Sequence, residues 1–145
     1  LRFRQNKYAV AATELRRAFA ANCYIADILC GHPDPTPLTI WHGSSFAMPD
    51  LAHDYVRDYG KLWHNSSDAV PFMHWLYNHP KVMAERAALL DCREQLVWAQ
   101  DVEQRQQILR QEQKLLALID DRLSDAIIVK RSTRDGRVVY PWWRL

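Results

Sequence analysis

The sequence predicts a mainly helical, single-domain protein with three parts: an N-terminal helical body (residues 1–79), a long helical segment (80–127) and a small C-terminal β-hairpin (128–145). Apolar side chains recur at three- and four-residue steps along much of the chain. Residues 81–135 contain neither glycine nor proline and are rich in strong helix formers. An Asp-Gly pair then separates two short apolar runs, which is typical of a hairpin turn.

The first predicted helix spans about residues 6–30. Asn6 can cap its start, and Gly31 ends it because glycine tolerates the left-handed turn after a helix. A stiff, extended, proline-rich connector over 32–38 follows, and we allow a brief strand at 39–41. One face of the helix carries an apolar stripe at helical spacing, formed by Tyr8, Ala12, Leu15, Phe19, Cys23, Ala26 and Cys30.

Two shorter helices complete the predicted body. Pro49 suits the first position of a helix over about 49–63, because the N–H that proline lacks has no helical partner at that position. The Asn-Ser-Ser triplet at 65–67 ends this helix and caps a third helix over about 68–78.

The long helical segment fits two arrangements. A straight helix from Pro80 to Ala126 would be about 70 Å long at 1.5 Å per residue. Alternatively, two antiparallel helices meet near Gln100, where Asp101 followed by Gln104 resembles a capping box. We favour one long helix that projects from the body, because turns without glycine, proline or asparagine are uncommon.

A heptad pattern marks the second half of this segment. Apolar side chains seven residues apart form a coiled-coil-like seam, although a helix buried in a core gives the same pattern. Tryptophan is enriched among interface anchors, and six tryptophans are more than one small core needs. We therefore predict binding of a protein partner, or of a second copy of the chain, through Trp98, Val102, Leu109, Leu116 and Leu123.

Charge is segregated along the chain. Residues 1–17 and 130–145 each carry a net charge of +4, whereas the 112 residues between them carry −6. Basic ends suit anionic polymers, and an acidic middle suits basic protein surfaces.

The C-terminal hairpin is predicted to have strands at 127–131 and 138–140, and it combines cations with aromatic rings. Cations neutralise phosphates and rings stack on unpaired bases, which predicts binding of single-stranded DNA. Alternatively, the arginines protect an edge hairpin from aggregation and the tryptophans dock on the body. The predicted nucleic-acid-binding residues are Lys130, Arg131, Arg134, Arg137, Tyr140, Trp142 and Trp143.

Several classes of protein are not indicated. No apolar run approaches the roughly 20 residues of a membrane span, and glycine-rich nucleotide-binding motifs are absent. Cys23, Cys30, His32 and His42 lack zinc-site spacing, and no nucleophile–base–orienter set is evident. We therefore expect no metal, no cofactor and no enzymatic activity. Three cysteines at no framework spacing fit a reducing compartment such as the cytoplasm.

Two stretches suggest a family. Residues 47–55 (AMPDLAHDY) and 139–143 (VYPWW) resemble the replication B proteins of P2-like temperate phages. The resemblance implies a non-enzymatic adaptor that binds the hexameric replicative helicase in the bacterial host cytoplasm and helps place it on single-stranded DNA. The resemblance does not assign functional residues of that family to positions in this sequence. The alternatives are a nucleic-acid-binding regulator that uses the hairpin, and a helical assembly protein that oligomerises through the long segment.

Overall fold

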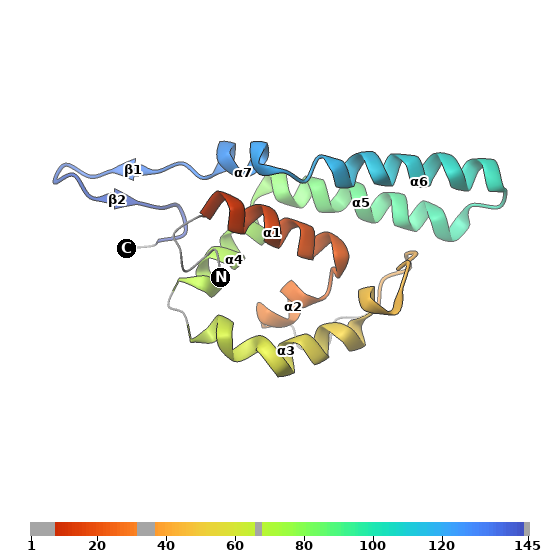
Figure 1. Ribbon diagram of the computed structural model, residues 1–145, viewed down its shortest axis with the longest axis horizontal. Coiled ribbons are helices and arrows are strands. Elements are labelled where there is room, and N and C mark those ends of the chain that lie inside the picture. Colours follow the sequence, from red (N-terminus) through yellow and green to blue (C-terminus); the bar gives the residue numbers. More distant parts are fainter. Residues whose placement is uncertain (1–7, 32–36, 66–67, 144–145) are drawn as a thin grey trace.

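The computed structural model describes residues 8–31, 37–65 and 68–143. Figure 1 shows α1 across the centre of the molecule, an antiparallel pair of helices extending to one end, and a β-hairpin extending to the other. The elements confirm the predicted fold class, and in chain order they are α1 (Tyr8–Ala21), α2 (Ile25–Leu29), a 3-10 turn η1 (Ser45–Ala47), α3 (Pro49–His64), α4 (Ala69–Tyr77), α5 (Pro80–Trp98), α6 (Val102–Ala117), α7 (Asp121–Ile127), β1 (Arg131–Ser132) and β2 (Val138–Val139).

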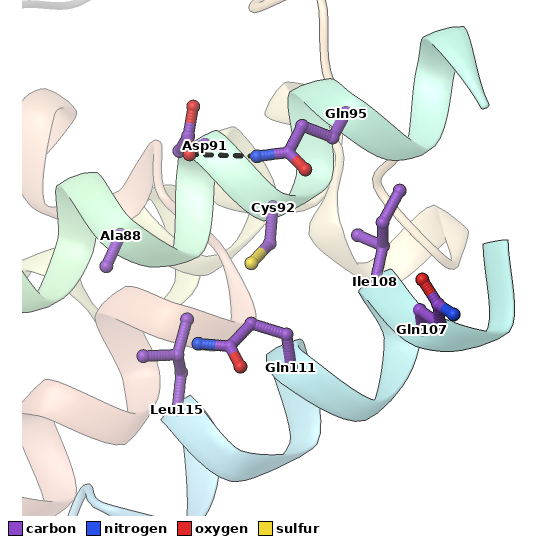
Figure 2. A pocket seen from close by; sticks show the side chains of 8 residues that line it. All are labelled: Ala88, Asp91, Cys92, Gln95, Gln107, Ile108, Gln111 and Leu115. Carbon is purple, nitrogen blue, oxygen red and sulfur yellow. Dashed lines mark hydrogen bonds between the residues drawn. The ribbon is translucent and has the colours of Figure 1, made fainter. Parts of the chain in front are cut away.

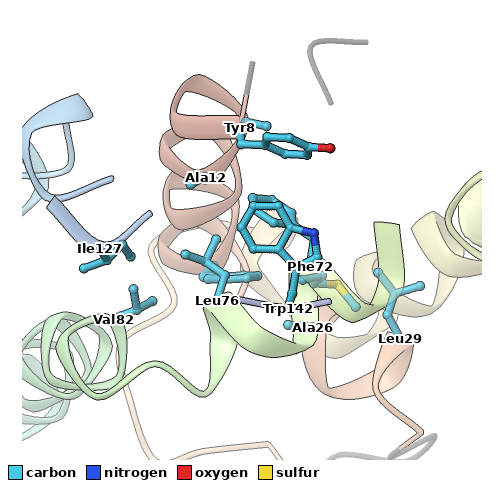
Figure 3. Packing of buried hydrophobic residues seen from close by; sticks show 12 residues of the cluster. Tyr8, Ala12, Ala26, Leu29, Phe72, Leu76, Val82, Ile127 and Trp142 are labelled. Atoms are coloured by element: carbon cyan, nitrogen blue, oxygen red, sulfur yellow. The ribbon is translucent and has the colours of Figure 1, made fainter. Parts of the chain in front are cut away.

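The principal core joins all three predicted parts of the chain. Helices from the body contribute large buried side chains such as Phe72 and Leu76, which are 0% exposed. Val82 of α5, Ile127 of α7 and Trp142 of the C-terminal tail complete the same cluster (Figure 3). The long segment and the hairpin are therefore packed against the body through one shared hydrophobic core.

A buried ion pair holds α1, α5 and α7 together. Arg16 of α1 is 1% exposed, and its guanidinium donates to both carboxylate oxygens of Glu85 on α5, at 2.5 and 3.0 Å. The same guanidinium donates to the carbonyl oxygen of Asp120 and to Oγ of Ser124, at 2.6 and 2.9 Å. Arg16 therefore belongs to the interior and does not add to the basic surface of the N-terminal end.

The predicted helix over 6–30 is wrong as a single element, because the chain breaks between α1 and α2. The side-chain amide of Asn22 donates to the carbonyl oxygens of Phe46 and Met48, at 2.9 and 3.1 Å. Its Oδ1 accepts from the backbone N–H of Tyr24 at 3.0 Å. Asn22 is thus held by a loop that lies more than twenty residues further along the chain.

The ends of the body helices agree closely with the sequence. Pro49 occupies the first position of α3, and α3 and α4 begin and end within one residue of the predicted bounds. Gly31 has a φ of 100°, as expected for a glycine that ends a helical segment. Residues 32–36 of the predicted connector and 66–67 of the predicted cap lie outside the described residues.

Two predictions about strands need correction. The brief strand expected at 39–41 is not formed, because the N–H of Trp41 instead donates to the carbonyl oxygen of Arg93 on α5 at 2.9 Å. In the C-terminal hairpin, Ile127 belongs to the last turn of α7, so the first strand begins only at Arg131.

The projecting helix over 80–126 is also wrong, since the chain turns back after α5 and runs antiparallel to it as α6 (Figure 1). The carboxylate of Asp101 caps α6 by accepting from the N–H of Gln104 at 2.7 Å. Arg105 donates to the carbonyl oxygen of Leu96 at the end of α5, at 2.9 Å. These side chains satisfy backbone groups that the turn leaves without helical partners, so the turn forms without glycine, proline or asparagine.

Arg93 is one of the residues that fasten the α5–α6 pair, which we call the arm, to the body. Arg93 of α5 pairs with Glu112 of α6, with 3.1 Å between Nε and Oε2. Its Nη1 also donates to the carbonyl oxygen of Ala20 near the end of α1, at 2.6 Å. Among the described residues, none of the helices combines the length and apolar character that crossing a bilayer requires.

Candidate functional site

The end of the arm carries an exposed apolar patch, which we call the arm tip and define as Val97, Trp98 and Val102. Their exposed fractions are 41%, 66% and 72%, respectively. Trp98 and Val102, both predicted to bind a partner, are therefore brought together at the turn between α5 and α6. Exposed apolar side chains grouped in this way are typical of a contact surface.

Carboxylates surround the arm tip. Glu94, Asp101 and Glu103 are exposed. Residues 94–105 contain one basic residue, Arg105. Arg105 is already engaged, because it donates to a carbonyl of α5 and its guanidinium carbon lies 5.3 Å from the ring centre of Trp41. The arm tip is thus an apolar patch in an acidic setting.

A small core supports the arm tip from below. Cys92, Leu96 and Ile108 form a buried cluster between α5 and α6, and Trp41 from the loop after α2 packs against it. Burial raises the pKa of the Cys92 thiol, so this group stays protonated at neutral pH. The tip therefore sits on a packed base that extends to the body of the protein.

The rest of the predicted heptad seam faces inward. Leu109 packs against the cluster below the arm tip, Leu116 against a second cluster with Leu89, and Leu123 against the principal core. All three side chains are partly buried within the chain. Val102 is the exposed member of the seam, so the four residues do not form a continuous stripe for another molecule.

Sequence reasoning missed a groove on the arm that is lined by both polar and apolar residues. The groove has a volume of about 410 Å³ and lies between α5 and α6 (Figure 2). Gln95 donates to Asp91 across one helical turn at 3.0 Å. The signal in the sequence is the set of glutamines at helical spacing on the two facing helices. The lining residues are Ala88, Asp91, Cys92, Gln95, Gln107, Ile108, Gln111 and Leu115.

The basic hairpin lies at the end of the molecule opposite the arm tip (Figure 1). Arg131 pairs with Val139 in the antiparallel β1–β2 ladder, and Gly136 adopts a φ of 82° in the turn. Arg137 is 79% exposed at its side chain and forms a solvent-exposed ion pair with Asp135 at 3.2 Å. The four predicted phosphate-binding cations are all exposed on this hairpin: Lys130, Arg131, Arg134 and Arg137.

The aromatic residues after the hairpin differ in their exposure. Trp142 is 4% exposed, and its ring lies 4.8 Å from that of Tyr8 and 4.7 Å from that of Phe72. Tyr140 is partly buried and stacks on Trp142 at 4.9 Å, whereas Trp143 is 38% exposed. The expectation that Trp142 offers a face to bases is therefore corrected, because its ring fills the core.

No protein-family model, curated protein or solved structure matches this chain. Among residues 8–31, 37–65 and 68–143, no three histidine, cysteine, aspartate or glutamate side chains are placed to hold a metal ion together. The arm tip and the basic hairpin are the exposed candidate binding surfaces among the described residues.

Proposed function

We propose that this chain is a non-enzymatic adaptor that binds a protein partner through the arm tip and single-stranded DNA through the basic hairpin. The observation that carries the proposal is the presence of two chemically opposite surfaces at opposite ends of one small protein (Figure 1). An acidic, apolar surface suits a protein partner, and a basic surface suits a polyanion. Their separation lets both ligands bind at once.

The arm tip defines the chemistry of the protein partner. Trp98 is the largest exposed side chain of the tip, and tryptophan dominates the binding energy of many interfaces. Because carboxylates surround it, the complementary surface is an apolar pocket with a basic rim. On the resemblance to the replication B proteins, we propose that this partner is a hexameric replicative helicase and that the chain is its phage-encoded loader.

The basic hairpin supplies the contact with DNA. Each phosphate neutralised on a single strand contributes about −0.7 to the slope of log affinity against log salt concentration. Contacts by all four hairpin cations correspond to a slope of about −2.8. A variant with Arg134→Ala and Arg137→Ala is expected to bind with a slope closer to about −1.4, as measured by fluorescence anisotropy at several salt concentrations.

Binding to a purified bacterial replicative helicase tests the protein side of the proposal. We expect the wild-type chain to bind the hexamer and Trp98→Ala to bind at least about 30-fold more weakly, the effect of losing a strong interface anchor. Met83→Ala is the matched control, because Met83 is 48% exposed near the opposite end of α5. Calorimetry gives the affinities, and circular dichroism verifies the fold of each variant.

Four results would contradict the proposal. The first is that the wild-type chain fails to bind the helicase, and the second is that Trp98→Ala binds the helicase as tightly as wild type. If the chain instead copurifies with nucleic acid alone, a regulatory role through the hairpin replaces the loader. If it forms a stable homo-oligomer with no other partner, an assembly role replaces it.

A further inference from the structure

A second concave feature lies where the α4–α5 turn meets the C-terminal tail. It is a surface hollow of about 830 Å³, within the range of small-molecule sites. The rings of Trp75 and Trp142 lie 5.3 Å apart, and the ring of His79 meets Trp75 edge-on at 5.5 Å. The lining residues are Pro71, His74, Trp75, Asn78, His79, Pro80, Pro141 and Trp142.

His79 and Asn78 supply hydrogen-bonding groups to the hollow. Nδ1 of His79 accepts from the backbone N–H of Lys81 at 3.2 Å and caps α5, so the neutral ring carries its proton on Nε2. Burial, assisted by the nearby Lys81 charge, lowers the pKa of His79 and favours this neutral form. Asn78 adds a side-chain carboxamide, whose oxygen can accept a hydrogen bond. Among the described residues that line the hollow, none is aspartate, glutamate, lysine or arginine.

This combination suits a flat, uncharged ring with hydrogen-bonding edges. Aromatic side chains stack on the faces of nucleobases, and neutral donors and acceptors pair with their edges. Three prolines, Pro71, Pro80 and Pro141, add rigid apolar surface to the lining. Among the described lining residues, no lysine or arginine is available to pair with a phosphate group.

The hollow is continuous with the basic hairpin. Pro141 and Trp142 line it and follow directly after β2 and Tyr140. Arg131 is paired with Val139, and the two residues from Val139 to Pro141 span at most about 7 Å of chain. Arg131, the first cation of the ladder, therefore pairs with a residue two positions before the segment that lines the hollow.

We propose that this hollow binds one unpaired nucleobase of a single strand whose neighbouring phosphates lie along the basic hairpin. The inference rests on the proposed DNA-binding role and assigns the base contact to the partly buried Trp75 and His79 rings. Trp142 then forms the buried floor. Because duplex bases are paired and stacked on one another, double-stranded DNA does not supply this ligand.

The test compares two strands of about 12 nucleotides, within the site sizes of single-strand-binding domains. One is oligothymidine and the other is an abasic strand with the same number of phosphates. We expect wild type to bind oligothymidine about 5-fold to 150-fold more tightly, the range for one stacked base. His74→Trp, which fills the hollow from an exposed position, should bind both strands equally. Ala84→Trp is the control, since Ala84 is exposed on α5 and does not line the hollow.

A second variant keeps the test independent of how His74→Trp folds. Trp75→Phe retains a ring against Phe72, and it should weaken binding of oligothymidine without changing binding of the abasic strand. A strand with one 2-aminopurine should also change fluorescence on binding to wild type more than on binding to His74→Trp. Equal responses of the two proteins would contradict base insertion.

The outcomes separate this inference from the proposed function. If the arginine substitutions at 134 and 137 flatten the salt dependence but wild type binds both strands equally, DNA binding stands and the base pocket is refuted. If wild type binds neither strand, both proposals fail. If a proline-rich peptide binds the hollow and His74→Trp blocks that peptide but not oligothymidine, the hollow is a peptide groove and the inference is overturned.

Discussion

Replacing Glu85 with alanine leaves a buried arginine without its counter-ion. Glu85 accepts two hydrogen bonds from Arg16, at 2.5 and 3.0 Å, and Arg16 is 1% exposed. In the variant, the guanidinium retains the carbonyl oxygen of Asp120 and the hydroxyl of Ser124 but no carboxylate partner at position 85. Breaking a buried ion pair from one side costs about 3–5 kcal/mol. A domain has about 5–15 kcal/mol of unfolding free energy in total.

Urea unfolding followed by circular dichroism measures this loss. At about 2 kcal/mol per molar urea, the midpoint should fall by about 2 M. The melting temperature of a chain of this length should fall by about 10–15 °C. Glu94→Ala is the control, because Glu94 is exposed on the same helix and its replacement should change stability by less than about 0.5 kcal/mol.

A double variant identifies the cause of the loss. Replacing both Arg16 and Glu85 with methionine removes both charges together and should restore much of the stability that Glu85→Ala loses. A loss below about 1 kcal/mol in Glu85→Ala would refute the reasoning, because a buried arginine cannot lose its counter-ion at so small a cost.

Three further predictions concern the cap formed by Asp101, the phenol of Tyr77 and the three cysteines. Asp101→Ala removes the cap of α6 and should lower the free energy of unfolding by about 0.5–2 kcal/mol; a urea midpoint equal to that of wild type would contradict the cap. Burial and a hydrogen bond to Asp27 raise the pKa of Tyr77 from 10.0 to about 12. The stabilisation from its neutral phenol is therefore complete below pH 10.0 and is lost as the pH rises through about 12. In Tyr77→Phe, the melting temperature should fall less between pH 10.0 and about 12 than it does in wild type. Identical pH profiles of the two proteins would argue against a raised pKa of Tyr77. Burial also raises the pKa of all three cysteines, so Ellman's reagent should react slowly with the folded chain and rapidly after unfolding; equally fast reaction in both states would count against their burial.

Structure was predictable from the sequence where neighbouring residues determine it. Pro49 marks the start of α3, and Gly31 ends the first helical region. The pair Asp101 and Gln104 also indicated the cap of α6, whereas the absence of glycine and proline favoured one long helix. The capped turn shows that an aspartate and one arginine can satisfy the free backbone groups of a helical hairpin.

Structure was not predictable where distant partners determine it. Asn22 breaks the first helix because its side chain bonds to carbonyls of a loop at residues 46 and 48. Arg16 and Trp142 look like surface residues in a basic, aromatic sequence, yet partners from other helices bury both of them. Their burial depends on how the helices pack, which local patterns do not encode.

The candidate site likewise has a part that the sequence predicts and a part that depends on packing. Residue type and spacing predicted Trp98 and Val102 as partner-binding residues, and the structure exposes both side chains at the arm tip. Charge predicted the cations of the hairpin, which are also exposed. The heptad spacing did not reveal that Leu109 and Leu116 pack inside the arm, since core and intermolecular seams share that pattern. The hollow around Trp75 was missed because its walls come from two segments, 71–80 and 141–142, that lie far apart in the sequence.

The central claim is that one chain holds a protein partner and single-stranded DNA at opposite ends. Its most direct test is a fluorescence-anisotropy titration of the replicative helicase into a preformed complex of this chain with a labelled single strand. We expect a further rise in anisotropy as a ternary complex forms, and we expect Trp98→Ala to abolish this rise while its own DNA affinity stays unchanged. The variant with Arg134→Ala and Arg137→Ala should keep its affinity for the helicase but bind DNA more weakly. Displacement of the strand by the helicase, or loss of both activities in either variant, would show that the two ligands do not bind at separate ends.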